Sequence, residues 1–297
     1  MLSILIPTYN YNAFPLAEEI HKQACFYEID FELICIDDGS NSKLNNENKK
    51  INNLVNATFI AHKTNMGRSG IRNFLAQKAK FEYLLFLDAD VKILNQNFLQ
   101  EYIKSIDKNS DIIYGGIEYQ KEAPKSNQHL RWFYGNKREA LNVNKRIKKP
   151  YIRFLTLSFL IKKDLFNTLT FNTEIPNLRH EDTLFSLNAK KKNFKVKHIN
   201  NPVLHTGLET SSVFLKKSEE AVYTLNYMIK KNLILPDEVA LSKFAQLCTK
   251  FKLNYPITLL FSSLKTPIKK QLLSKTPSLL LFDFYRLGYF LSLNSKK

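Results

Sequence analysis

The stretch EYLLFLDAD, residues 82–90, places an unbroken apolar run directly before two aspartates. A strand that lacks polar alternation is covered on both faces, as in a parallel sheet with helices on either side. Ligands bind to such sheets beyond the carboxyl ends of the strands. Asp88 and Asp90 therefore stand where this strand would leave the sheet, at the edge where a ligand is expected.

Strand-like and helix-like patterns alternate through the first half of the chain, which indicates βαβ units. Strands are expected over 2–7, 31–40, 57–62 and 82–90, with helical patterns over 12–27, 44–55 and 65–79. The sequence thus predicts an α/β fold, a Rossmann-like and mostly parallel central sheet flanked by helices. Residues 121–150 are polar and basic.

The pattern changes along the second half of the chain. A strand with a glycine kink is expected over 111–120 and another over 151–163, followed by a helix start at 179–192 and short strands at 194–199 and 202–207. After about Leu208, helical patterns cover 211–232, 236–251 and 276–293. We therefore expect a catalytic α/β domain over 1–208 and a C-terminal helical appendage over 209–297.

The composition is that of an ordinary globular protein except for its charge. Apolar residues make up 44% and charged residues 24%, and the formal net charge is +17. Such a surface attracts polyanions, whether nucleic acid, anionic lipid or nucleotide phosphate. Three scattered cysteines favour a reducing compartment. The N-terminus is a poor signal peptide, and no stretch is apolar enough to span a membrane.

Polar residues follow the first, second and fourth expected strands. Thr8 and Tyr9 follow the first, Asp37 and Asp38 the second, and the D-x-D pair the fourth. A divalent cation that also holds phosphate oxygens binds one or two protein carboxylates. The alternative is that these acids form an Asx turn or cap the next helix.

Further motifs carry charged or titratable groups. Arg72 lies one turn into a glycine-opened helix, where a diphosphate is favoured, although the spacing is not that of a P-loop. Glu181 and Asp182 open another helix, either as a general base or as acids that favour the helix dipole. His205 follows a strand and could complete a metal site, although a lone histidine is more often a core or surface residue.

Taken in order, SILIPTYN, IDDGS, NMGRSGIRN, FLDAD, HEDTLF and VLHTG resemble the motifs of family 2 glycosyltransferases with the GT-A fold. The resemblance covers roughly residues 1 to 208 and is strongest to bacterial, Bacteroidetes-like inverting members. It implies that Asp182 is the catalytic base and that Glu181 orients the acceptor. It implies a metal site at Asp90, Asp88 and His205. It implies a donor site at Pro7, Thr8, Tyr9, Asp37, Asp38, Gly67, Arg72, Asp88, Ala89 and Asp90.

The resemblance also implies a reaction. A hexosyl or N-acetylhexosaminyl group would pass from a nucleotide-sugar, a UDP-sugar by analogy, to a hydroxyl of a glycan or lipid-linked acceptor, assisted by Mn²⁺ or Mg²⁺. The expected role is cell-surface polysaccharide or glycoconjugate synthesis. The expected location is cytoplasmic, with peripheral contact at the anionic inner face of the plasma membrane. No specific nucleic acid is expected.

Three alternatives follow from the same residues. A sugar-phosphate nucleotidyltransferase would need a glycine-rich basic loop after the first strand, where PTYNYNAF stands instead. A nucleic-acid-binding protein would use basic clusters such as KRIKKP. In a membrane-surface module, helix 276–293 would touch anionic lipid together with nearby lysines, but we expect that helix to be buried. Those lysines are Lys265, Lys269, Lys270 and Lys275.

Overall fold

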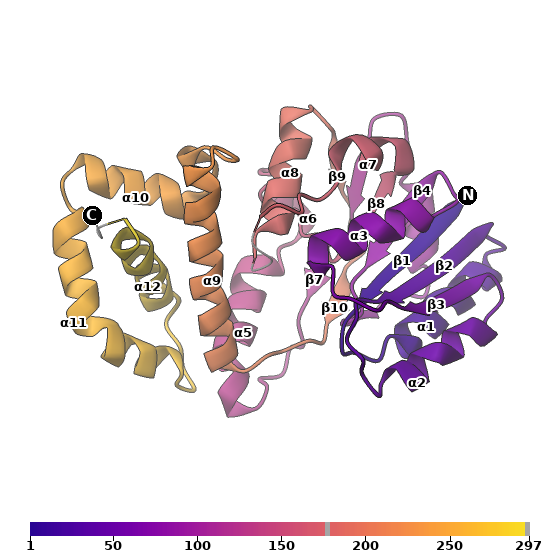
Figure 1. Cartoon of the computed structure of the whole chain (residues 1–297), viewed down its shortest axis with the longest axis horizontal. Helices are drawn as coiled ribbons and strands as arrows, with labels where there is room; N and C mark the ends of the chain where they lie inside the picture. Colours follow the sequence, from indigo (N-terminus) through magenta and orange to yellow (C-terminus); the bar gives the residue numbers. More distant parts are fainter. Residues whose placement is uncertain (176–178, 295–297) are drawn as a thin grey trace. The chain divides into compact units, whose positions relative to one another are not determined.

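The computed structural model describes residues 1–175 and 179–294 and divides the chain into two compact units (Figure 1). Unit 1 is an α/β unit composed of Met1–Gln120, Glu139–Thr173 and Glu181–Gly207. Unit 2 is helical and composed of Lys121–Arg138, Glu174–His180 and Leu208–Lys297. The helical unit thus takes in part of the basic segment 121–150 besides the residues after Leu208.

The main sheet of unit 1 has seven strands and is mostly parallel. Its order is β3 (Ala57–Ala61), β2 (Phe31–Asp37), β1 (Leu2–Thr8), β4 (Tyr83–Leu87), β8 (Ser158–Lys162), β6 (Ile112–Tyr114) and β9 (Val196–His198). Strand β8 runs antiparallel to both of its neighbours. The first four strands are parallel, so β1, β2 and β4 end at the same edge.

A second, three-stranded sheet pairs segments that are far apart in the sequence. Strand β10 (Val203–His205) lies between β5 (Val91–Ile93) and β7 (Ile117–Glu118). It is antiparallel to β5, and the register sets His205 opposite Val91. Because Val91 directly follows Asp90, this pairing brings His205 to the D-x-D turn.

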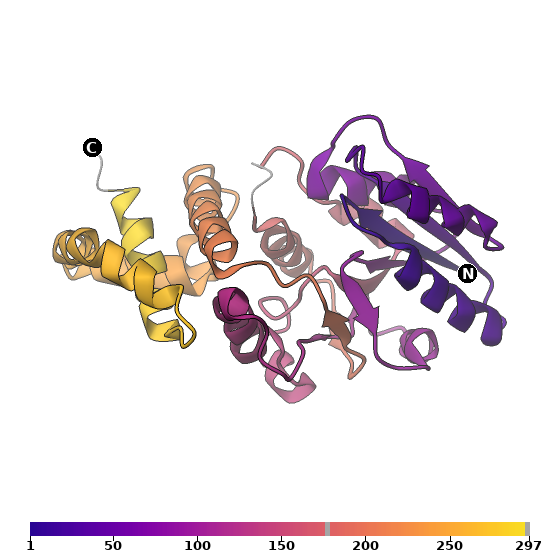
Figure 2. The ribbon, with the colours of Figure 1, turned by 90° about the horizontal axis from the view of Figure 1, so that it is seen from below.

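Helices cover the main sheet, and their bounds are α1 (Phe14–Phe26), α2 (Asn45–Asn48), α3 (Gly67–Lys78), α4 (Phe98–Lys104), α6 (Val143–Arg146), α7 (Lys163–Leu169) and α8 (Glu181–Lys191) (Figures 1 and 2). Side chains of α3, α7 and α8 pack with β-strand residues in one apolar core. Phe86 stacks on Phe159 and Phe166 there, with ring centroids 4.9 and 5.2 Å apart. Stacked rings of this kind fix the strands and helices that carry the site.

Three expected elements of unit 1 differ from the prediction. The helix expected over 44–55 is the short α2 followed by a 3₁₀ segment, Lys49–Asn53. Asn48 shows the reason, since its amide binds the Ala13 N–H (2.8 Å) and the Tyr11 carbonyl (3.0 Å) instead of facing solvent. The strand expected over 151–163 is only Ser158–Lys162.

The glycine kink expected within 111–120 separates two strands that belong to different sheets, β6 and β7. Gly116 has a φ of 109°, and a Cβ atom there would lie 2.8 Å from Nη2 of Arg146. The buried Arg146 guanidinium donates to the carbonyl oxygens of Tyr114, Gly115 and Ile199. A residue without a side chain is therefore required where the chain passes from one sheet to the other.

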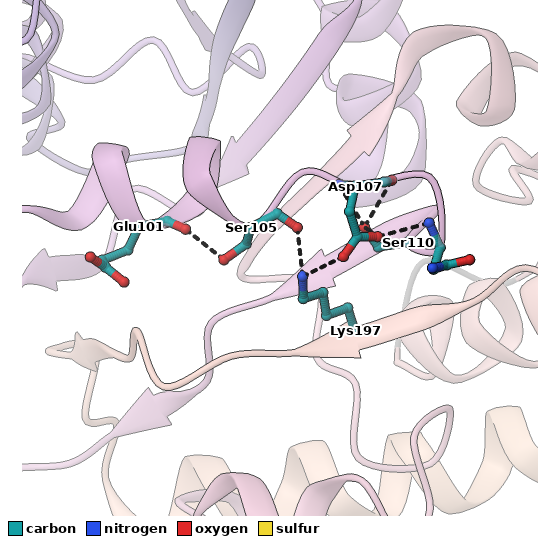
Figure 3. Close-up of polar contacts among 6 residues, drawn as sticks. Glu101, Ser105, Asp107, Ser110 and Lys197 are labelled. Carbon is teal, nitrogen blue, oxygen red and sulfur yellow. Dashed lines mark hydrogen bonds and ion pairs between the residues drawn. The ribbon is translucent and has the colours of Figure 1, made fainter.

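An ion pair fastens the edge strand β9 to the turn after α4 (Figure 3). Lys197 Nζ donates to the Ser105 carbonyl (2.9 Å) and lies 2.7 Å from Asp107 Oδ2. Asp107 also accepts from the Ser110 hydroxyl and the Asn109 N–H. The lysine hydrogen bond is the main cause that lowers the pKa of Asp107 to about 2. Strand β9 leads directly into β10, so this contact supports the position of His205.

Unit 2 is built from α5 (His129–Tyr134), α9 (Ser211–Lys230), α10 (Ala240–Lys250), α11 (Asn254–Leu272) and α12 (Leu279–Ser292). Short helical segments lie at Ser126–Gln128, at Pro236–Glu238 and at Gly135–Glu139, whose last residue belongs to unit 1. Figure 1 shows α12 enclosed by α9, α10 and α11. Its residues Phe282, Tyr285 and Phe290 are buried, as expected. Gly288 lets α11 approach, because a Cβ atom there would lie 2.3 Å from the Phe261 ring.

Helix α11 was not predicted as a helix. It carries Pro267 in its interior, and a proline in such a position usually indicates a break. Within 1–175 and 179–294, none of the helices combines the length and apolar character that a membrane-spanning segment requires.

Candidate active site

The carboxyl ends of β1, β2 and β4 and the first turns of α3 enclose a pocket of about 200 Å³. Residues of all three strand ends reach it, as a parallel sheet requires. Most of the donor-side residues expected from the sequence meet here. The lining residues are Pro7, Thr8, Tyr9, Tyr11, Asp38, Arg68, Ile71, Arg72, Asp88, Ala89 and Asp90.

Asp90 is held by the end of β10. His205 Nε2 lies 3.4 Å from Asp90 Oδ2. Thr206 donates to the Asp90 carbonyl oxygen twice, from its N–H (2.9 Å) and from its hydroxyl (2.8 Å). A Cβ atom on Gly207 would stand 2.3 Å from Asp90 Oδ2, so only glycine leaves the carboxylate where it is. Three consecutive residues of VLHTG thus position one aspartate.

The Asp90–His205 pair fits a divalent cation. With bonds of about 2.1 Å, adjacent ligands of an octahedral Mg²⁺-type ion are about 3 Å apart, close to the observed 3.4 Å. No cluster of three or more His, Cys, Asp or Glu side chains with metal-site geometry occurs among the described residues. The structure therefore brings together two of the three predicted ligands, which leaves coordination positions for phosphate oxygens and water.

Asp88 has a different partner. Its Oδ1 lies 2.5 Å from Nη2 of Arg72, a residue that is only 4% exposed. Burial lowers the pKa of the Arg72 guanidinium, but Asp88 and Glu181 outweigh burial and the pKa lies above its ordinary value. The Arg72 Nε–H is buried and has no hydrogen-bond partner among residues 1–175 and 179–294. Arg72 is therefore a permanent cation in the pocket wall with one unused donor.

The two acids at the end of β2 have separate roles. Asp37 accepts from the Ser40 N–H (3.0 Å), the Ser40 hydroxyl (2.6 Å) and the Asn45 amide (3.0 Å). It does not line the pocket, so the structure gives it the part of a turn residue. Asp38 does line it, and its Oδ1 accepts from the Met66 N–H (2.7 Å). Burial raises the pKa of Asp38.

Gly67 also stands outside the pocket lining. Its φ of 74° is in the left-handed region, and its N–H donates to Asn65 Oδ1 (3.0 Å). Such a backbone suits glycine, which here turns the chain into α3. Gly67 thus shapes the helix start that holds Asp38 and presents Arg72.

Glu181 and Asp182 open α8 and face the arginines of α3. Glu181 Oε1 lies 3.0 Å from Nη1 of Arg68. Burial, and then the nearby Glu181 charge, raise the pKa of Asp182 to about 6, against the lowering influence of the Thr183 N–H, Arg68 and Arg72. A carboxylate with this pKa is ionised at neutral pH and basic enough to accept a proton, which suits a general base.

Four residues near the pocket were not singled out from the sequence: Arg68, Tyr11, Thr206 and Gly207. Arg68 lies four residues before Arg72, so it projects from the same side of α3, and that spacing was a usable signal. The Tyr11 hydroxyl shares a hydrogen bond of 3.2 Å with the Thr206 hydroxyl. This contact depends on folding across almost the whole of unit 1, which no local pattern reveals.

Comparison with known proteins gives a consistent result. The profile of glycosyl transferase family 2 matches residues 3–170. An uncharacterized glycosyltransferase of Haemophilus influenzae is 25% identical over 246 residues, which are 78% of this chain and 88% of that protein. A poly(ribitol-phosphate) beta-glucosyltransferase of Bacillus spizizenii is 32% identical over 206 residues, 66% of this chain. This chain spans only 30% of that second relative's length.

Among solved structures, Staphylococcus aureus TarS 1–349 in complex with UDP-GlcNAc has a similar fold. Its TM-score is 0.51 at 19% identity, and the match covers 99% of this chain and 91% of that chain. The similarity extends over both compact units of this protein and is a likeness of fold.

Proposed function

Because this chain belongs to glycosyl transferase family 2 and is a glycosyltransferase of the GT-A fold, we propose that it transfers a sugar from a UDP-sugar to a hydroxyl group with inversion. The observation that carries the proposal is the meeting of residues from the β1, β2 and β4 ends and from α3 at one pocket, whose Arg68 and Arg72 interact electrostatically with the Asp182 carboxylate of raised pKa. The pocket would hold the donor, and Asp182 would serve the acceptor. The UDP-GlcNAc bound to TarS supports the choice of nucleotide.

The donor side follows from the charges in the pocket. Asp38 would accept hydrogen bonds from the nucleoside, and Thr8 and Tyr9 would border it. Arg72 lines the pocket and would face the diphosphate with its permanent positive charge. Asp88 keeps this arginine in place through their 2.5 Å contact and would accept from a sugar or ribose hydroxyl. The leaving diphosphate therefore meets a fixed cation.

Asp90 and His205 would hold a divalent ion, Mn²⁺ or Mg²⁺, whose positive charge stabilises the diphosphate as it gains negative charge. Asp88 would then act in the pocket through Arg72 rather than as a ligand. Thr206 and Gly207 would keep the Asp90 carboxylate oriented.

On the acceptor side, Asp182 would take the proton of the attacking hydroxyl. The hydroxyl oxygen forms a bond to the anomeric carbon, and the bond from that carbon to the diphosphate breaks with its electron pair leaving on the diphosphate. Glu181, paired with Arg68, would orient the acceptor. A single displacement with one base inverts the anomeric centre.

We propose a growing surface glycan or a lipid-linked glycan as the acceptor, in a reaction on the cytoplasmic side of the membrane. The basic surface supports an acceptor that carries phosphate, because the net charge is +17. Poly(ribitol-phosphate), which the B. spizizenii relative is named for, is an acceptor of this kind and the first to assay.

The test is a thermal-shift screen of UDP-, GDP- and dTDP-sugars with and without Mn²⁺, followed by transfer assays. Asp90→Asn should lose the part of the stabilisation that depends on Mn²⁺. Asp182→Asn should bind the donor as the wild type does and fail to transfer it. Full transfer activity in Asp182→Asn would refute the base assignment. A wild-type protein that ignores every nucleotide-sugar at saturating Mn²⁺ would refute the donor site.

A further inference from the structure

Helices α10 and α11 expose a set of large apolar side chains, here called the α10–α11 face. Phe244 and Leu247 lie three residues apart on α10, and Phe251, four residues further, directly follows the last residue of that helix, so the three project from about the same side. Further large apolar side chains are exposed at Leu253, in the connection, and on α11 from Tyr255 to Leu264. The exposed fractions run from 40% to 73% for Phe244, Leu247, Phe251, Leu253, Tyr255, Leu259, Leu260 and Leu264.

The core of unit 2 does not account for this face. Helix α10 buries a different side, with Ala245 and Cys248, and α11 buries Phe261, Ile268 and Leu272. Both helices are thus already packed within the unit, and a second apolar side remains in contact with solvent. Single exposed apolar residues are common, but eight of them on two consecutive helices and their connection mark a binding surface.

The charge around the face is of one sign. Between residues 239 and 282 the chain has no Asp or Glu, while all of its lysines in that range are exposed: Lys243, Lys250, Lys252, Lys265, Lys269, Lys270 and Lys275. On α10, Lys243 and Lys250 lie beside the exposed apolar side chains, on the side of the helix opposite to the buried Cys248. Apolar side chains bordered by lysines are the pattern of a helix that lies in a membrane interface.

We propose that the α10–α11 face binds an anionic lipid surface, with its Phe and Leu side chains at the acyl-chain boundary and its lysines among the lipid phosphates. The charge favours this partner over a second copy of the chain, because a symmetric contact would set lysines against lysines with no acid in the segment. The proposal differs from the membrane-surface alternative in the sequence analysis, because it assigns the lipid contact to α10 and α11 and not to α12, whose Phe282, Tyr285 and Phe290 are buried. The proposal goes beyond the transfer reaction and does not depend on it.

Flotation of the full chain with vesicles tests the proposal. Vesicles of phosphatidylcholine alone are compared with vesicles that contain an equal part of phosphatidylglycerol. The wild type should float only with the anionic vesicles. Phe244→Ser/Phe251→Ser should lower its partition coefficient by at least about tenfold, because two inserted aromatic side chains are lost. The control Phe26→Ser/Val55→Ser removes two apolar side chains that are 78% and 71% exposed in unit 1, and should float normally.

Charge is tested separately. Each lysine near an anionic surface contributes about fivefold to binding, so Lys265→Gln/Lys269→Gln/Lys270→Gln should lower the partition coefficient by about a hundredfold. The matched control neutralises the three consecutive exposed lysines 190–192 of unit 1 and has the same net charge. The partition coefficient of this control should fall far less than that of the Lys265→Gln/Lys269→Gln/Lys270→Gln variant. Circular dichroism and melting temperatures of all variants establish that they are folded.

Three results would overturn the proposal. One is a wild type that stays with the buffer when anionic vesicles float at low salt. Another is an equal loss in each variant and its control, which would indicate attraction by net charge alone. The third is concentration-dependent self-association that Phe244→Ser/Phe251→Ser abolishes without any vesicle binding, which would assign the face to contacts between copies of this chain.

Discussion

Substitution Gly207→Ala tests whether the end of β10 positions the Asp90 carboxylate. The new Cβ atom would lie 2.3 Å from Asp90 Oδ2, while ordinary contact begins at 3.4 Å. The carboxylate must therefore move by about 1 Å, and a displacement of that size in a catalytic group lowers the rate by about a hundredfold. The fold should survive, because the atom that moves is the end of a side chain.

The assay is the transfer rate at saturating donor and Mn²⁺, measured in a double-mutant cycle with Asp90→Ala. Gly207→Ala should lower kcat by about a hundredfold in the wild-type background. This loss corresponds to an activation barrier that is higher by roughly 2.7 kcal/mol. In the Asp90→Ala background it should have almost no effect, because no carboxylate remains to be displaced. An equal loss in both backgrounds would refute the reasoning, since the alanine would then act through the backbone.

The remaining predictions concern the base, the donor cation and the core. Because the pKa of Asp182 is raised to about 6, kcat should rise with pH through that value; at pH 5 only about one-tenth of the base is ionised, and a flat profile would contradict the assignment. Arg72→Gln should weaken UDP-sugar binding by about tenfold to a hundredfold in calorimetry, since a charged hydrogen bond is lost and Asp88 loses its partner. Phe86→Ala should destabilise the protein by about 3–5 kcal/mol in chemical denaturation, because two ring contacts are lost in the core; an unchanged denaturation midpoint would show that the stacked core contributes little.

The parallel strands of the first half could be predicted because their apolar runs are local and unbroken. The orientation of β8 could not, since it depends on partners more than 70 residues away in β4. Strand β5 has three residues, too few for a pattern. Helix α11 was not predicted, and Pro267 in its interior indicates a break, yet the helix continues through it. In these three elements, contacts with distant residues determine the structure more than local sequence preference does.

The candidate site divides in the same way. Asp38, Arg72 and Asp90 were predictable, because a strand end or helix start marks each of them in the sequence. The separation of Asp88 from the Asp90–His205 pair was not predictable, because it depends on a partner from α3 and on the β5–β10 register. Asp88 and Asp90, separated by one residue, contact different partners in the folded turn, and their spacing in the sequence does not predict which partner each one has.

Helix α3 links the pocket at the strand ends to the start of α8. At its start, the Met66 N–H holds Asp38 (2.7 Å). Arg68 in the first turn contacts Glu181, and Arg72, about one turn after Arg68, contacts Asp88 (2.5 Å). These contacts tie the ends of β2 and β4 and the start of α8 to a single rigid element. A shift of α3 would therefore move Asp38, Asp88 and Glu181 together.

The same helix also holds the segment that precedes α8. The Asn73 amide donates to the Phe171 carbonyl (2.8 Å) and accepts from the Phe171 N–H (2.9 Å). The Phe171 ring lies 5.4 Å from the Arg72 guanidinium and stacks on Phe185 of α8, with centroids 4.3 Å apart. Paired hydrogen bonds and a stacked ring fix both position and rotation. Arg72 and Asn73 of NMGRSGIRN therefore hold α3 and α8 in a fixed relation through Phe171.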